Sequence, residues 1–192
     1  MVSLRTGSTG YLLRALQPSA SDPRYADGLA RLRLPVGANT VVTLNALLAG
    51  DALAVSRNGL QESSQLRTSL GYYWLHTSTR SDGGAGDPRF DVWLGHSRID
   101  TRRTGTLDSP GLASGMLGEH RLSGIWDLRT QLQWSPWQSH VLETGLSLSQ
   151  GQASYTYHSQ VRYAPGIGWR LGVPDENSED FDIQPRRYTS AI

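Results

Sequence analysis

The sequence predicts an all-β protein, an antiparallel up-and-down sheet of the transmembrane β-barrel type with long extracellular loops. Three observations support this fold class. Apolar and polar side chains alternate over segments of about ten residues, short and long connections join these segments, and tryptophans flank one of the short turns. A strand that crosses a bilayer at a tilt needs ~9–11 residues, and it turns apolar side chains to lipid and polar ones to a wet lumen.

Residues 122–148 contain the clearest alternation. Every second residue of 122–134 lies on a largely apolar side, and only Ile125 interrupts the polar side. The alternation resumes after a turn at 135–139. Successive side chains of a strand point to opposite faces, so the segment predicts a β-hairpin with one apolar and one polar face. Its first arm spans about a dozen residues, whereas strands of soluble proteins most often have roughly 5–6.

Composition narrows the classes of function. The 192 residues suffice for one domain, and the absence of cysteine excludes disulfides and thiolate chemistry. A formal net charge of +1 gives no electrostatic reason to expect a nucleic-acid partner. No apolar run approaches the ~18 residues of a transmembrane helix, and residues 1–10 lack the apolar core of a secretory signal. If the protein is exported, we therefore expect that the sequence is a piece of a longer chain or that its start is misassigned.

The N-terminal half predicts four strands, at residues 8–16, 25–34, 40–51 and 64–76. A tight turn at 35–39 joins the second strand to the third, and a long loop at 50–63 joins the third to the fourth. Arg31, Arg33 and Asp27 share one face of the second strand. Charges are costly in a dry core unless they are paired, but they are tolerated in a wet lumen.

The C-terminal half predicts a strand at 90–96, the hairpin, and a last strand that begins at 187–192, which makes about seven to eight strands in all. Long loops are expected at 101–120 and 149–186. Together with 50–63 they alternate with the short turns, as in outer-membrane barrels, which have short periplasmic turns and long outer loops. The connection at 77–88 is longer than this scheme predicts.

Residues 134–145 (WSPWQSHVLETG) resemble the strand–turn–strand unit of TonB-dependent outer-membrane receptors, in which a proline-containing turn precedes H-x-L-x-x-G. Residues 22–51 resemble the same unit, and the final QPRRYTSAI resembles the way these chains re-enter the membrane. The resemblance implies that residues 1–192 form a single partial barrel domain. The implied function is uptake of a scarce ligand, such as a metal–siderophore chelate or an oligosaccharide, across the outer membrane of a Gram-negative bacterium.

The resemblance also implies partners, namely outer-membrane lipid, a small extracellular ligand and the TonB energising complex. The last is reached through a plug domain, and the sequence contains no plug, no TonB-box-like segment and no closing strand with a terminal aromatic residue. In such a receptor, aromatic rings and arginines of the external loops would contact the ligand. The predicted ligand contacts are Arg102, Arg103, Tyr155, Tyr157, Arg162, Tyr163, Trp169 and Arg170. The predicted lipid-interface girdle is Trp74, Trp134 and Trp137.

Two alternatives remain open, a soluble secreted carbohydrate-binding β-sandwich and a small outer-membrane pore. Catalysis is not expected, because the sequence has no nucleophile elbow or phosphate-binding loop, and its five histidines form no metal-binding pair. The acidic run at 175–182 lacks the glycine and glutamate of an EF-hand, since Asp180 and Arg186 stand at those positions. We therefore expect no metal, no cofactor and no catalytic residue.

Overall fold

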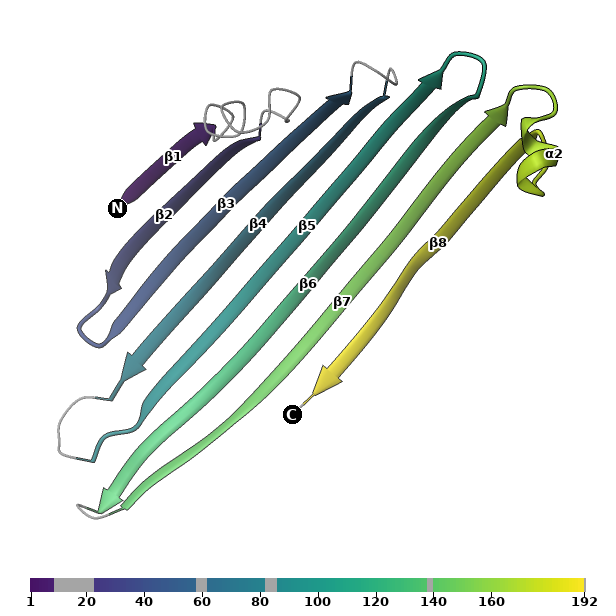
Figure 1. The fold of residues 1–192 in the computed structure, drawn as a ribbon. Helices are drawn as coiled ribbons and strands as arrows, with labels where there is room; N and C mark the ends of the chain where they lie inside the picture. The colour runs from purple at the N-terminus through teal and green to yellow at the C-terminus, as the bar shows by residue number, and fades with distance from the viewer. Residues whose placement is uncertain (9–22, 58–61, 82–85, 138–139, 192) are drawn as a thin grey trace.

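The computed structural model describes residues 1–8, 23–57, 62–81, 86–137 and 140–191, which form one open antiparallel sheet of eight strands (Figure 1). Strand order in the sheet follows chain order, so the all-β, antiparallel, up-and-down prediction is confirmed. Among the described residues, the sheet is not closed, and β1 and β8 form its two edges. The elements are β1 (Val2–Ser8), β2 (Arg24–Val36), β3 (Thr40–Arg57), β4 (Glu62–Arg80), β5 (Arg89–Ser109), β6 (Ala113–Trp137), β7 (His140–Tyr163), α2 (Ile167–Leu171) and β8 (Glu176–Ala191).

The central strands are much longer than predicted. β4, β5, β6 and β7 have 19, 21, 25 and 24 residues. At about 3.3 Å per residue, β6 extends roughly 80 Å, far more than the ~30 Å of a bilayer core even when the strand is tilted. The prediction of long loops at 101–120 and 149–186 is wrong, because β5, β6, β7 and β8 occupy most of those residues.

The connection between β5 and β6 is a tight turn. The Leu112 backbone N–H donates to the Ser109 carbonyl at 2.9 Å, and Gly111 has a φ of 75°. Proline at the second position and a glycine with positive φ at the third define a type II turn. Gly37, with a φ of 76°, likewise lies in the turn between β2 and β3, which confirms the predicted turn there, although the strand extends through Val36.

Three other predictions change. The predicted loop at 50–63 is largely strand, since β3 extends to Arg57 and β4 begins at Glu62. The connection at 77–88 is shorter than predicted, because β4 includes residues up to Arg80. The predicted strand at 8–16 lies, except for its first residue, outside the described residues. The structure instead contains β1, which pairs with the first part of β2 and was not predicted.

The sheet has two faces, which we call A and B, and two halves. Residues paired across antiparallel strands share a face. In the lower half, nearer the β2–β3, β4–β5 and β6–β7 connections (lower left in Figure 1), face A is apolar and face B is polar. The register places on face A of this half Leu32, Leu34, Val42, Leu44, Leu75, Val92, Leu94, Trp126, Leu128, Leu132, Leu142, Leu146 and Leu148.

The upper half, nearer the β3–β4, β5–β6 and β7–β8 connections, has the reverse arrangement. Polar side chains there lie on face A, among them Arg98, Asp100, Arg102, Thr104, His120, Gln152, Thr156 and His158. Apolar and aromatic side chains lie on face B, among them Leu66, Leu70, Ile99, Leu117, Tyr155, Tyr157, Val161 and Phe181. The alternation does not end where long loops were predicted; it changes face.

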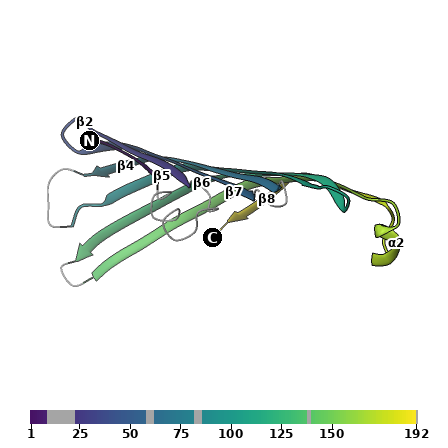
Figure 2. The same ribbon diagram turned by 45° about the horizontal axis from the view of Figure 1, so that its top comes forward.

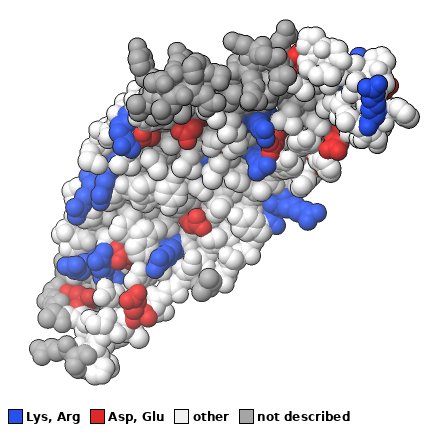
Figure 3. All heavy atoms as spheres, in the orientation of Figure 1, with Lys and Arg blue, Asp and Glu red and all other residues white. Residues whose placement is uncertain are grey.

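Among the described residues, no second layer covers the sheet. No hydrophobic side chain is buried among the described residues. Those of face A in the lower half are exposed or half-buried, and the exposed ones include Leu32 at 52%, Trp126 at 53% and Leu142 at 52%. Figure 2 shows that the sheet is curved. Figure 3 shows charged side chains gathered at the lower left. The visible side there is face B, since the described charged residues of the lower half lie on that face.

Candidate functional site

The predicted ligand contacts lie on strands and on α2, and the register separates them by face. Tyr155 and Tyr157 lie on face B of β7, where their rings stack at 6.4 Å between centroids. The Phe181 ring lies 6.1 Å from Tyr157, and the Arg121 guanidinium lies 5.2 Å over the Tyr155 ring. A row of three rings with a cation at one end therefore crosses β6, β7 and β8. Phe181 and Arg121 were not predicted, because they become neighbours of the tyrosines only through strand pairing.

Arg102 and Arg103 point to opposite faces, because they are consecutive residues of β5. Arg103 lies on face B and shares with Tyr157 a hollow of about 470 Å³. Arg102 lies on face A, where its Nε donates to Asp100 Oδ1 at 3.2 Å. The His120 Nε2 lies 3.1 Å from the same oxygen. Of the two predicted arginines, only Arg103 therefore shares a surface with the tyrosine row.

The remaining predicted contacts lie near the upper end of the sheet. The Arg162 Nη2 donates to Glu176 Oε1 at 3.3 Å on face A. A hydrogen bond from Gln160, together with this interaction, lowers the pKa of the Glu176 carboxyl below its ordinary value. Tyr163 is at the end of β7 on face B, and its backbone N–H donates to the Asp175 carbonyl at 2.7 Å. The last two predicted contacts, which are both exposed, lie on α2: Trp169 and Arg170.

The three tryptophans of the predicted girdle do not share one face. Trp134 lies on face A, at the lower end of the apolar side chains of β6, and is 42% exposed. Trp137 pairs with His140 at the end of the β6–β7 hairpin and is 67% exposed. Trp74 lies on face B, where its ring centroid is 4.9 Å from that of Tyr72. A lipid-facing ring on face A can therefore include Trp134 but not Trp74.

A second cluster, which was not predicted, lies on face B of the lower half. The side chain of Asp91 is only 7% exposed, and it accepts hydrogen bonds from Arg89 at 3.2 Å and lies 2.9 Å from His76 Nε2. The His76 ring stacks on Trp93 at 4.8 Å with an interplanar angle of 1°. The Arg129 guanidinium lies 5.6 Å from the Trp93 ring. These contacts connect β4, β5 and β6 across the sheet.

The Arg89 Nε illustrates how closely this cluster is packed. It lies 2.8 Å from Asp91 Oδ2 and so belongs to the ion pair. The angle at the proton is nevertheless unsuitable for a hydrogen bond, and this buried N–H has no hydrogen-bond partner. The Asp91 carboxylate therefore compensates the charge of Arg89, but it leaves the Nε–H of the Arg89 guanidinium without a hydrogen bond.

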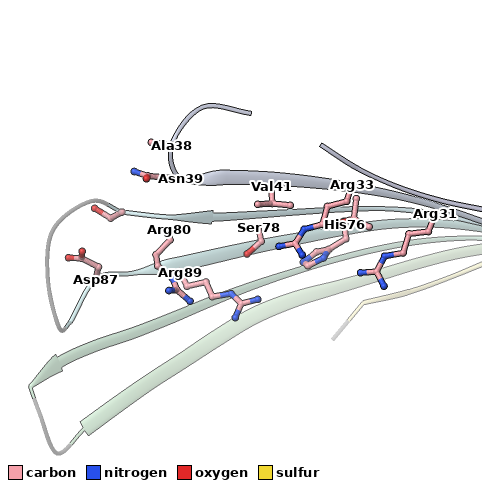
Figure 4. Close-up of a pocket in the computed structure, with 12 residues that line it drawn as sticks. Arg31, Arg33, Ala38, Asn39, Val41, His76, Ser78, Arg80, Asp87 and Arg89 are labelled. Carbon is pink, nitrogen blue, oxygen red and sulfur yellow. The ribbon is translucent and has the colours of Figure 1, made fainter. Parts of the chain in front are cut away.

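Beside this cluster, the curved sheet forms a hollow of about 750 Å³, which we call the arginine hollow. Four arginines line it, two from β2, one from the end of β4 and one from the start of β5: Arg31, Arg33, Arg80 and Arg89. Figure 4 shows Arg31, Arg33 and His76 projecting from the strands to the same side. Thr43 and Ser78 add hydroxyl groups to the lining. The alternation of Arg31 and Arg33 with leucines predicts that these two arginines share a face. That Arg80 and Arg89 line the same hollow follows only from the register of the strands.

No cluster of three or more histidine, cysteine, aspartate or glutamate side chains suited to a metal ion occurs in the described part of the chain. Comparisons of the chain with protein-family models, with curated proteins and with solved structures found no match. Within the described residues, no helix combines the length and the apolar character needed to cross a membrane.

Proposed function

We propose that this sheet is a segment of an outer-membrane β-barrel, part of a TonB-dependent receptor that takes up a small extracellular ligand. The observation that carries the proposal is the uncovered apolar surface on face A of the lower half. Exposed apolar patches larger than a few hundred Å² are rare on soluble proteins. The leucines, valines and aromatic residues of β2 to β7 form such a surface, with no protein layer over it among the described residues. Lipid is the environment that suits it.

The height of this surface supports a lipid environment. On β6 the apolar side of the alternation extends from Leu122 to Trp134, which is roughly 40 Å along the strand at about 3.3 Å per residue. A barrel strand tilted by ~35–45° would span ~30 Å of bilayer with that length, close to the ~25 Å band of known outer-membrane barrels. On the neighbouring strands, face A becomes polar at Arg98 and Gln152, which the register places beside Gly124 at the upper end of this segment, as expected for a surface that begins to leave the membrane there.

Face B supports a wet interior. In the lower half its side chains include Arg31, Arg33, Asp127, Arg129 and Gln131, and these charges would be unfavourable against lipid or in a dry core. Facing an aqueous lumen, they keep their hydration. The opposite polarity of the two faces over the same residues is the pattern of a membrane-crossing strand.

The receptor assignment rests on the sequence resemblance together with the upper half of the sheet. There Arg103, Arg121, Tyr155, Tyr157 and Phe181 lie on face B, on the side that continues from the lumen. Aromatic rings and arginines bind ligands that combine apolar and anionic groups. In the proposal, these side chains contact the ligand above the membrane, and the lower half holds the barrel in the lipid.

The membrane proposal is tested by depth-dependent quenching of tryptophan fluorescence. Single-tryptophan variants that retain Trp126 on face A of the lower half, or Trp169 on α2, are reconstituted into vesicles containing lipids brominated in their acyl chains. We expect strong quenching of Trp126 and no quenching of Trp169. Equal quenching of both, or a chain that stays in solution without detergent or lipid, would contradict the proposal.

The receptor assignment has an independent test in the nucleotide sequence that flanks this reading frame. A TonB-dependent receptor requires an in-frame plug domain upstream and further alternating strands downstream. If the flanking frames encode neither, the receptor assignment fails, while the membrane proposal depends only on the quenching result.

A further inference from the structure

We propose that the arginine hollow binds a small anion that has two or more oxyanion groups, such as phosphates or carboxylates. This inference goes beyond the proposed function and does not depend on a membrane, because it concerns a surface formed by the described strands themselves. The hollow lies at the lower end of face B, at the opposite end of the sheet from the predicted ligand contacts.

The first reason is an uncompensated charge. Asp91 is engaged by Arg89 and His76, so its carboxylate is occupied by contacts within the cluster. In the described part of the chain, no ion pair involves the side chains of Arg31, Arg33 or Arg80. Four arginines against Asp87 and Asp91 leave an excess of two positive charges around one hollow when His76 is neutral.

The second reason is the register, which places like charges directly opposite each other. Arg80 of β4 pairs with Arg89 of β5, and both side chains line the hollow. Like charges in directly opposed positions destabilise a sheet. On β2, Arg31 and Arg33 are two residues apart on the same face, which separates their Cα atoms by roughly 6.6 Å. An anion between these two pairs would relieve both repulsions.

The third reason is the chemistry and size of the lining. A guanidinium presents a planar fork of N–H donors that matches the oxygens of a phosphate or a carboxylate. Thr43 and Ser78 provide hydroxyl groups between the two arginine pairs. The volume of about 750 Å³ lies within the ~300–1,000 Å³ range of small-molecule sites, which is far larger than a single inorganic phosphate needs. We therefore assign to the hollow a ligand with several anionic groups.

Isothermal titration of the full chain in detergent tests this assignment, with pyrophosphate as the phosphate probe and citrate as the carboxylate probe at constant ionic strength. The test variant is Arg33→Gln/Arg80→Gln, which removes one arginine from each pair. The control variant is Arg98→Gln/Arg187→Gln, which removes the same charge from face A. We expect the test variant to bind at least tenfold more weakly than the unaltered chain, and the control to stay within twofold.

Binding of pyrophosphate alone, of citrate alone or of both would support the site and identify its preferred oxyanion. If neither probe binds, or if the two variants weaken binding equally, the assignment is overturned. A measurement on the unaltered chain guards against misfolded variants. Pyrophosphate or citrate, whichever binds, should slow phenylglyoxal modification of Arg33 and Arg80 but not of Arg98, and equal rates at all three positions with and without the probe would also overturn it.

Discussion

Along β5, Phe90, Val92 and Leu94 lie on face A, whereas Ile99 and Leu107 lie on face B. The backbone ladder to β4 and β6 continues through this change without interruption. The lower and upper halves of the sheet thus share one hydrogen-bonding scheme and differ in which face is apolar. Strand length in this protein is therefore set by the backbone ladder, while the side chains determine the environment of each face.

The charged clusters of the two halves also differ. In the lower half, Asp91 is almost fully buried between His76 and Arg89. In the upper half, Asp100 occupies a similar arrangement with Arg102 and His120, but its side chain is 16% exposed and lies on the other face. The lower cluster is enclosed by the curvature of the sheet, whereas the upper one is nearer to solvent. Substitutions in matched positions should therefore have unequal effects.

The largest expected effect comes from placing a charge on the apolar band. If the sheet is inserted in a membrane as proposed, Leu94→Arg should destabilise it by about 2–4 kcal/mol, because an arginine near the bilayer midplane loses its hydration. Thr104→Arg, on the same strand and face but in the upper half, should be close to neutral. Urea unfolding in lipid vesicles measures both changes. Equal destabilisation by the two variants would remove the distinction between the halves.

The next effect concerns the buried carboxylate. Asp91→Ala should cost about 1–3 kcal/mol, since it leaves His76 and Arg89 without their shared partner. Asp100→Ala should cost about 0.5–1.5 kcal/mol, because the groups that contact Asp100 remain hydrated when it is removed. Denaturant titrations of the two variants under one condition provide the comparison. A larger loss at Asp100 would contradict the greater enclosure of the lower cluster.

A smaller effect is expected where the two halves meet. The Tyr188 ring of β8 covers Gly151 of β7 and fills the space that a Cβ would need. Gly151→Ala should displace this ring and cost about 1 kcal/mol. Gly118→Ala, where a Cβ would meet nothing within 4 Å, should stabilise the strand by about 0.5 kcal/mol through reduced backbone entropy. Unfolding midpoints that shift in the same direction for both variants would show that the ring does not occupy this place.

The smallest effect is a pH dependence at the upper end of the sheet. Hydrogen bonds from Gln160 and Arg162 lower the pKa of Glu176 below its ordinary value near 4.5. A carboxyl whose folded-state pKa is depressed stabilises the fold above its unfolded pKa, and this contribution is lost as pH falls through the folded value. Glu176→Gln should therefore lower the unfolding midpoint slightly at pH 6 and leave it unchanged at pH 2. A difference that grows on acidification would have the wrong sign.

Much of the lower half could be predicted from the sequence. The alternation in 25–34, 40–51 and 122–148 marks strands whose apolar residues occupy one face, and the structure places them on face A. Most of the upper half could not be predicted in this way, since the apolar residues of β5 change from even positions such as Leu94 to odd ones such as Ile99. Because the apolar side is not continuous along the strand, the alternation predicts a strand only up to this change and a loop beyond it.

The sites show a similar limit. Sequence alone could single out Arg102, Arg103 and Tyr155 as chemically suited to ligands, but only the register shows that Tyr155 shares a face with Arg103 and not with Arg102. The arginine hollow was even harder to predict from the sequence, because Arg33 and Arg80 are far apart in sequence and come together through two strand pairings. Long-range pairing, rather than local pattern, determines which residues share a surface.

The change of apolar face within each long strand also has a positional consequence in a bilayer. If the sheet moved deeper into the membrane, Arg98 and Asp100 on face A would enter the hydrocarbon region. If it moved outward, Leu94 and Leu128 would enter water. In the proposed bilayer both displacements would be costly, so the strands themselves would fix the depth of immersion. The position of the sheet relative to a bilayer core of ~30 Å would thus depend on where the apolar side chains change from one face to the other.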